Sequence, residues 1–367
     1  MESFTMGEFS GGGDRLNRLS SGLITPGGFP MQAIHVVGRF GRLLSVYALY
    51  QYFMGGKSSV VVFTFGTLLG STIIFFAIQK PWKGRPLSQS QLVPTLINGG
   101  VLALSLVLWG KGLRACGPVR TVLAEYVGAV LGAISTLLFG RGGHVQRKIG
   151  GLIAMLAAFY FLSQGWAMAT FSPFSFKSNS TSEGSGYEKG HVGLQSMIVP
   201  IVSGLLAALR RIIARRVSLK SRSKKRFHAI TVAAATCFLF PFAIVNLAFG
   251  DSGSKSENHG LAVVPYLIMI FFGTVMIYYV DAFVEDKLQV LPSSPQHLLV
   301  TGFCLIILEF LYRMDFSFLG FLWCLAWLGS GIYAATILDK FQREVDQGEG
   351  DFLRESRSEL ALSSLPS

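Results

Sequence analysis

Three acidic residues lie inside or at the end of long apolar stretches, where a carboxylate could take part in the movement of ions or protons. Glu125 lies about two turns into one stretch, Glu309 lies near the end of another, and Asp281 ends a third. Ionisable groups are costly within a membrane and often mark ion or proton pathways. These three residues are therefore the transport candidates. The alternative is local ion pairing along a helix, of Glu125 with Arg120 and of Glu309 with Arg313, and for Glu125 we favour this structural role.

Residues that could bind a metal ion are scattered. None of the six histidines has an acid four residues later, and the four cysteines lack the paired spacing of a zinc knuckle or a disulfide framework. No Ser/His/Asp constellation can be assembled either. The sequence therefore gives no metal site, no cofactor and no reason to expect an enzyme. The histidines are His35, His144, His191, His228, His259 and His297, and the cysteines are Cys116, Cys237, Cys304 and Cys324.

The elements that carry these residues are about ten apolar stretches of near-spanning length. Hydrophobic residues make up 51% of the 367 residues, charged residues only 14%, and the mean hydropathy is +0.50. About 20 helical residues cross a bilayer, so we predict an all-α, polytopic membrane helix bundle embedded in the lipid bilayer. The stretches cover residues 34–53, 58–78, 91–109, 119–139, 149–170, 192–208, 228–249, 261–280, 297–311 and 318–337.

The first stretch is ambiguous, because Arg39 and Arg42 lie inside it. It could begin at Leu43 with the arginines reaching back to the interface, or lie on the membrane surface as an amphipathic helix. The expected number of spans is therefore nine or ten.

The chain divides into a flexible arm (1–30), a transmembrane domain (31–338) and a tail (339–367). Within the domain, residues 34–170 and 192–337 have similar lengths and five stretches each. An odd number of spans makes successive halves antiparallel, as in inverted-repeat transporters. The drug and metabolite transporter fold is built in this way, and the two halves could form such a repeat.

Basic residues fall mainly on alternate loops. Of the 32 lysines and arginines, 24 lie on one side of the predicted bundle. By the positive-inside rule this side is cytosolic, and both ends of the chain should face it. Asn179 begins an Asn-Ser-Thr glycosylation pattern in a loop that the same rule places on the lumenal side.

The net charge of +12 could suggest nucleic-acid binding, but the densest basic cluster joins two spans. A cytosolic loop facing anionic lipid explains this cluster better, and we expect no nucleic-acid partner. Two glycine pairs, Gly66 with Gly70 and Gly128 with Gly132, have the spacing that lets helices approach closely. Packing within the bundle is the favoured explanation over a dimer interface.

The segment from Gly112 to Leu123 contains Cys116, Gly117, Pro118 and Arg120. It resembles the amino-terminal membrane domain of the large cation diffusion facilitators, zinc transporters of the early secretory pathway. Further similarity occurs around residues 135–139, 238–241 and 271–281. In that family, zinc is exchanged for protons at two histidines and two aspartates on helical His-x-x-x-Asp pairs, which are absent here.

Three functions remain open. The resemblance implies an auxiliary or partial zinc-transporter subunit of the Golgi or endoplasmic reticulum, acting in a hetero-oligomer with a complete zinc transporter. The layout of five and five spans suggests an autonomous carrier of a small solute such as a nucleotide sugar. The third possibility is a structural membrane scaffold. We rank them in this order on the sequence alone.

Overall fold

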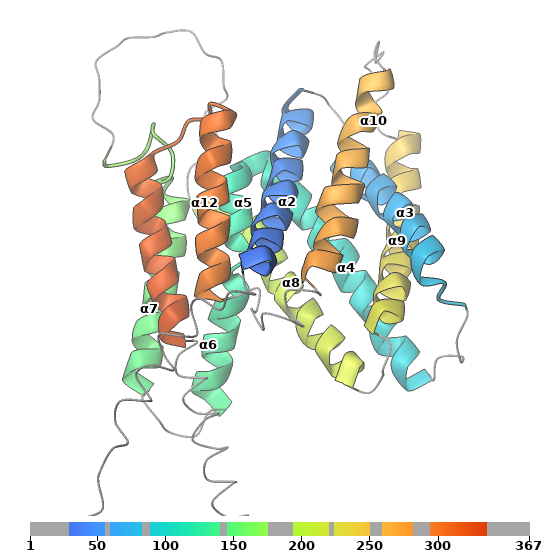
Figure 1. Ribbon diagram of the computed structural model, residues 1–367, viewed down its shortest axis with the longest axis horizontal. Helices are drawn as coiled ribbons and strands as arrows, with labels where there is room; N and C mark the ends of the chain where they lie inside the picture. Colours follow the sequence, from blue (N-terminus) through green and yellow to red (C-terminus); the bar gives the residue numbers. More distant parts are fainter. Residues whose placement is uncertain are drawn as a thin grey trace, which may run out of the picture.

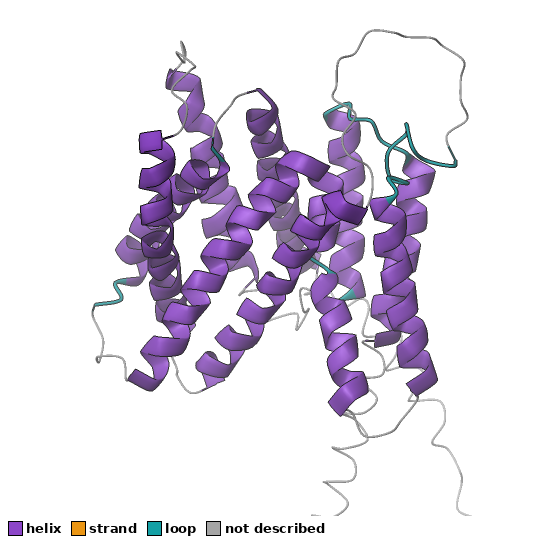
Figure 2. Ribbon diagram, turned by 180° about the vertical axis from the view of Figure 1, so that it is seen from behind, coloured by secondary structure: helices purple, strands orange, loops and turns teal. Residues whose placement is uncertain are grey.

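The computed structural model describes residues 29–55, 59–82, 89–139, 145–174, 194–219, 224–249, 259–281 and 294–335. All regular elements in these ranges are helices (Figures 1 and 2). Seven of them are long and apolar enough to cross a membrane. This confirms the predicted class, a polytopic membrane helix bundle. Asn179, the arm before residue 29 and the tail after residue 335 lie outside the described residues.

The first five predicted stretches correspond to six helices. They are α2 (Phe29–Gly55), α3 (Val60–Gln79), α4 (Gln89–Cys116), α5 (Pro118–Ala124), α6 (Val127–Phe139) and α7 (Val145–Ser163). The fourth stretch was predicted as one continuous span. It is instead divided into α5 and α6 by a turn at Glu125 and Tyr126.

The last five stretches follow the same plan. They form α8 (Leu194–Leu219), α9 (Lys224–Phe249), α10 (His259–Ile268) continued by the π-helix η1 (Met269–Met276), α12 (Pro295–Leu311) and a last helix, Phe318–Ala335. The span that starts in α10 ends at Asp281. In η1 the backbone turns are wider than in an α-helix, and the Thr274 side-chain hydroxyl donates to the carbonyl of Met269, five residues earlier.

The contacts that helices of the first half make with the second half have counterparts in the opposite direction. α4 packs against α8 and α9 of the second half, and η1 packs in the corresponding way against α2 and α3 of the first half. α6 contacts α8 as α12 contacts α2, and α3 and α9 contact each other. α4 and α8 lie side by side as two inclined helices in Figure 2. This pattern of contacts fits an inverted arrangement of two five-span halves.

Small residues let the helices approach. A methyl group added to Gly66 would lie 2.8 Å from the Tyr266 ring, and one added to Gly70 would lie 2.5 Å from Ile270. Gly128 faces α8 in the same way, with the methyl group of Ala208 at 3.1 Å. Three of the four predicted packing glycines therefore line contacts within the bundle. Gly132 has no neighbour within 4 Å, so it belongs to no packed interface in the described structure.

The first stretch is one continuous helix of 27 residues, α2, which is not among the seven helices that are long and apolar enough to cross a membrane. Arg39 is 4% exposed and Tyr47 is 1% exposed, so α2 lies inside the bundle and not on its surface. Figure 1 shows α2 between α12 and the α10 span, near the centre of the molecule. The arginines that suggested a surface position are satisfied by acids on other helices, as described below.

Candidate functional site

The turn between α5 and α6 places Glu125 and Tyr126 in the interior of the bundle. α8 passes this turn closely, because a methyl group added to Gly204 would lie 2.2 Å from the carbonyl oxygen of Ala124. Neither proline nor glycine occurs at the turn itself. Interrupted membrane helices often provide the backbone and side-chain groups of transporter binding sites. The turn is therefore the natural starting point for a candidate site.

One face of α2 directs three polar side chains toward this turn. His35, Arg39 and Arg42 follow one another at intervals of four and three residues, so they lie on the same side of the helix. His35 and Arg39 are buried, and Arg42 is partly buried. Such a polar stripe on a membrane helix requires partners in the protein interior.

The two arginines find acidic partners in different halves of the chain. Arg39 forms an ion pair with Asp281, at the end of the α10 span. Arg42 donates from Nη2 to both carboxylate oxygens of Glu125, at 2.6 and 2.8 Å. α2 thus joins an acid of the first half to an acid of the second half.

Glu125 has a further partner in Trp109 on α4, whose indole N–H donates to its Oε1 at 3.1 Å. The predicted local pairing of Glu125 with Arg120 is therefore wrong. Arg120 contacts the thioether of Met168 instead. An arginine from a distant helix has replaced the neighbour in sequence, because the turn at Glu125 directs its side chain toward α2 and α4.

Tyr126 connects the turn to α12. Its hydroxyl lies 2.6 Å from Nδ1 of His297 and 2.8 Å from the Thr301 hydroxyl, and all three side chains are buried. A tyrosine hydroxyl has one proton, so it can donate to only one of these atoms, and the choice depends on the tautomer of His297. The rings of His35 and His297 lie 5.6 Å apart. The Nε2 atom of each histidine is buried and has no hydrogen-bond partner in the described part of the chain.

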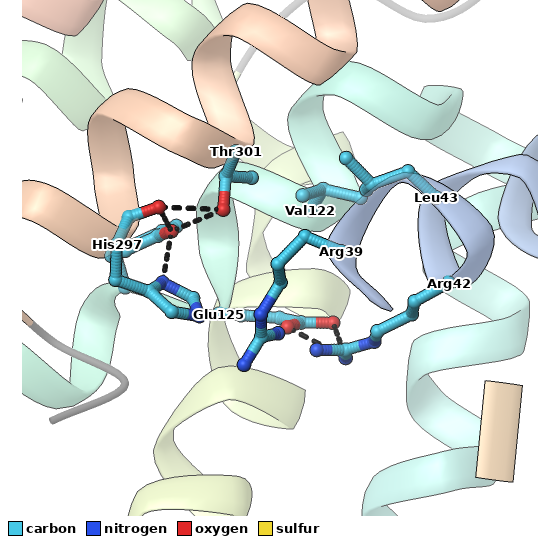
Figure 3. Close-up of a pocket in the computed structure, with 8 residues that line it drawn as sticks. Arg39, Arg42, Leu43, Val122, Glu125, His297 and Thr301 are labelled. Atoms are coloured by element: carbon cyan, nitrogen blue, oxygen red, sulfur yellow. Dashed lines mark hydrogen bonds and ion pairs between the residues drawn. The ribbon is translucent and has the colours of Figure 1, made fainter. Parts of the chain in front are cut away.

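A cavity lies at the centre of this cluster. Its lining consists of Arg39, Arg42, Leu43, Val122, Glu125, Tyr126, His297 and Thr301. In Figure 3 the His297 ring and the guanidinium groups of both arginines point into the space around Glu125. The cavity has a volume of about 10 Å³, roughly the room for one water molecule. The ion pair of Arg42 with Glu125 and the side chain of His297 occupy its walls, so a larger ligand would need these groups to move.

Two more arginines, Arg210 and Arg211 on α8, lie close to the same charges. Both interact electrostatically with Arg42, Glu125 and Asp281. Nη1 of Arg211 lies 4.0 Å from the position of a methyl group added to Gly128, at the start of α6. Within the described ranges neither arginine forms an ion pair. The site thus combines four guanidinium groups with two carboxylates.

Glu309 does not line this cavity. Glu309 accepts a hydrogen bond from the Tyr47 hydroxyl, and both residues are buried. The predicted pairing of Glu309 with Arg313 is therefore replaced by a contact with α2. Of the three acids proposed from the sequence, Glu125 and Asp281 meet at one cluster through Arg42 and Arg39, whereas Glu309 does not join them.

The corner between α4 and α5 contains the four residues of the family-like segment. Gly117 has a φ of +81° and a ψ of 172°, a conformation that is essentially restricted to glycine. Pro118 follows as the first residue of α5, where its missing N–H is not needed. The Cys116 thiol donates to the carbonyl of Ser196 at 2.8 Å, which attaches the corner to α8. The cavity lining contains none of the four residues of this segment, which form the corner before α5 and its first turn: Cys116, Gly117, Pro118 and Arg120.

The described residues include no group of three or more histidine, cysteine, aspartate or glutamate side chains placed to hold a metal ion. The chemistry that the cluster can perform is electrostatic: guanidinium groups and imidazole nitrogens bind oxygen atoms of an anion or hold a proton. The sequence alone does not single out most of these residues, because arginines near the end of an apolar stretch, such as Arg39 and Arg42, are also typical of the membrane interface. The four-and-three spacing from His35 to Arg42 was the available signal.

No protein-family model matches the sequence. Seventeen chains of known structure match the fold. One of these crystal structures is 13% identical in sequence with a TM-score of 0.50, and the match covers 84% of this chain and 98% of that chain. At this identity the similarity concerns the fold alone. It extends over nearly the whole of the other protein, so the helical bundle as a unit recurs elsewhere.

Proposed function

We propose that this multipass membrane protein is a carrier of a small solute, which binds at the cavity between α2, the α5–α6 turn and α12. The observation that carries the proposal is the buried cluster of ion pairs at this turn. Ionised groups in the membrane interior are expensive and are usually retained for function. The inward-facing polar stripe of α2, with its partners in both halves, supports the proposal because carriers move one half against the other around a central site.

In such a carrier the ion pairs would act as movable contacts. Arg39 with Asp281 and Arg42 with Glu125 attach α2 to two different elements, and a bound solute that competes for either guanidinium group would loosen one attachment. A solute can shift an equilibrium between two conformations only by binding them with different strength. Competition for an ion pair supplies this difference in binding free energy.

The test is solute exchange in liposomes that contain the purified protein. Liposomes loaded with an unlabelled nucleotide sugar would be diluted into the labelled compound, and labelled organic phosphates and dicarboxylates would be tested in parallel. We expect exchange above that of empty liposomes for at least one compound. Tyr126→Phe should reduce the rate about tenfold, because it removes the hydroxyl that bridges His297 and Thr301.

The matched control is Tyr160→Phe, which makes the same change on an exposed surface of α7. It should leave the exchange rate unchanged. Equal rates for both variants and the wild-type protein would remove the cavity from the transport path. An absence of exchange for every solute class would argue against a carrier.

A second candidate function rests on the resemblance at Cys116, Gly117 and Pro118, which form the tight corner before α5. As an auxiliary subunit of a zinc transporter in the Golgi or endoplasmic reticulum, the chain would act together with a complete transporter. Purification in mild detergent followed by identification of the co-purifying membrane proteins tests this function. Recovery of a zinc transporter would favour it over the autonomous carrier.

For zinc itself we predict that liposomes containing only this chain take up no more of the ion than empty liposomes. A hydrated dication crosses a membrane only where fixed ligands replace its water, and the paired histidines and aspartates of the zinc-transporter family are missing from the sequence. A zinc-sensitive dye inside the liposomes measures the uptake. Rapid, saturable zinc entry would contradict the prediction and would require ligands of another kind.

A further inference from the structure

We infer that the cavity and the arginines beside it form a binding site for an oxyanion, of the phosphate or carboxylate type. The inference deepens the proposed carrier function by naming the chemical class of its substrate. It rests on three observations, which are the charge balance of the cluster, the unpartnered buried nitrogen atoms and the position of the start of α6.

The charge balance leaves two positive charges without a partner. Arg39 is paired with Asp281 and Arg42 with Glu125, whereas Arg210 and Arg211 form no ion pair among the described residues. Both of the latter lie on α8, and Nη1 of Arg211 is 4.0 Å from the position of a methyl group added to Gly128, three residues after Glu125. Both guanidinium groups are partly exposed, and a partly buried charge without a counter-charge is costly. An anion bound next to the two ion pairs would supply it.

The unpartnered nitrogen atoms show where such an anion could be held. His297 is 6% exposed, lines the cavity, and has an Nε2 atom without a hydrogen-bond partner in the described structure. The Nε2 atom of His35 and the Nε atom of Arg39 are also buried and unpartnered in these ranges. Buried polar atoms are nearly always satisfied in native proteins. Oxygen atoms of a ligand would satisfy nitrogens of this kind when they carry a proton.

The start of α6 adds a third favourable contribution. The helix dipole makes the start of a helix partly positive, and its first N–H groups have no partner four residues earlier in the helix. In α6 the N–H of Ala129 donates to the carbonyl of Tyr126. Arg211 reaches the same end, close to Gly128. Planar guanidinium groups bind phosphate and carboxylate through two parallel hydrogen bonds. Arg211 and the start of α6 would therefore bind the same oxyanion.

The size of the cavity indicates how the anion enters. The cavity has room for about one water molecule, which is too little for a phosphate group. The oxyanion would first contact Arg210 and Arg211, which are partly exposed, and would reach His297 only after the ion pairs rearrange. Two sources of this chemistry are possible, a soluble organic anion and the headgroup of an anionic lipid.

The experiment measures anion binding by the full chain in lipid nanodiscs, at constant ionic strength set with chloride. In nanodiscs of phosphatidylcholine, inorganic pyrophosphate should raise the midpoint of thermal unfolding in a saturable manner. Arg211→Gln should weaken the apparent affinity about tenfold or more, since one charged pair of hydrogen bonds is lost. Arg210→Gln is the second variant, in case the first does not fold. The control is Arg114→Gln, which changes an exposed arginine of α4 and should bind as the wild-type protein does.

A second set of nanodiscs containing phosphatidic acid distinguishes the source of the anion. Stabilisation by this lipid that pyrophosphate cannot reproduce, and that Arg211→Gln abolishes, would support the site with a lipid headgroup as its ligand. Absence of saturable stabilisation by either ligand would overturn the inference, as would equal affinity in both site variants and the control. Failure of the carrier function looks different: pyrophosphate would bind, but no solute would exchange across liposomes. Exchange of a neutral solute without anion binding would preserve the carrier and refute the anion site.

Discussion

The carboxylate of Glu125 accepts hydrogen bonds from two helices other than its own, α2 and α4. Its partner Arg42 has no other acid within ion-pair distance among the described residues. In the membrane interior, removal of one member of such a pair leaves the other charge uncompensated. The contact therefore has a measurable role in stability whether or not it also takes part in transport.

Glu125→Gln should lower the stability of the protein by about 3 kcal/mol, since it keeps the shape of the side chain but leaves Arg42 unpaired. The double variant Glu125→Gln with Arg42→Gln should recover most of the loss, because two amides can hydrogen-bond without a net charge. The measurement is the midpoint of thermal unfolding in detergent. A single variant as stable as the wild-type protein, whose transport no longer responds to pH, would instead assign Glu125 to a proton or ion path.

Residue spacing explains both what the sequence revealed and what it concealed. Glu125 and Asp281 were identified as candidates because an acid in an apolar stretch is conspicuous. Their partners were assigned to sequence neighbours, since along a single helix only residues three or four apart can meet. The actual partners of Glu125 and Asp281 lie 83 and 242 positions away. Hydropathy cannot show pairing between residues so far apart in the sequence. The polar residues on one face of α2 nevertheless indicate that α2 has polar partners on other elements.

At the scale of the elements, all ten predicted stretches exist as helices, because length and hydropathy alone determine which segments can cross a bilayer. The interruption at Glu125 and the π-helix η1 were not predicted. No glycine or proline lies at the interruption, so composition gives no signal there. Close packing against α8 does coincide with it: Gly204 faces the carbonyl of Ala124 at the end of α5.

Gly204→Ala should therefore destabilise the protein by about 2 kcal/mol or more, because the added methyl group would lie 2.2 Å from a backbone oxygen and α8 would have to move. Gly132→Ala is the matched control on another helix, with open space around the new methyl group. It should be neutral or stabilise slightly, since alanine favours the helical conformation. Thermal unfolding of both variants in the same detergent compares them directly. Equal midpoints would show that α8 does not press on the turn.

At the scale of the whole molecule, the exchange of contacts between the two halves connects the fold with the site. α2 meets η1 and α12 as α8 meets α4 and α6, so the helices that open the two halves occupy equivalent positions. α2 contributes Arg39 and Arg42 to the centre, and α8 contributes Arg210 and Arg211. Each half thus brings two arginines to the cluster on its first helix. This is the arrangement expected if a central ligand is bound between two halves that move.

An even number of passes, as the sequence predicts if all ten stretches cross, would place both ends of the bundle on the same side of the membrane. Figure 1 shows α2 beginning toward the same side on which the last helix ends. The loop pattern assigns 24 of the 32 basic residues to that side, so the positive-inside rule predicts that it is cytosolic. We predict that protease added to sealed vesicles digests the tags at both ends when the cytosolic face points outward. The tags should be protected when this face points inward.

Asn179 gives an independent measurement of the same topology, because an acceptor asparagine can be glycosylated only on the lumenal side. We expect that any glycan on the protein is lost in Asn179→Gln, seen as a shift in gel mobility equal to that produced by enzymatic deglycosylation. A new acceptor site placed in the basic segment between α8 and α9 should stay unmodified, since nine of the cytosolic basic residues lie between Arg210 and Arg226. Protection of one terminal tag and digestion of the other would require an odd number of passes, and α2 would then be the helix that does not cross.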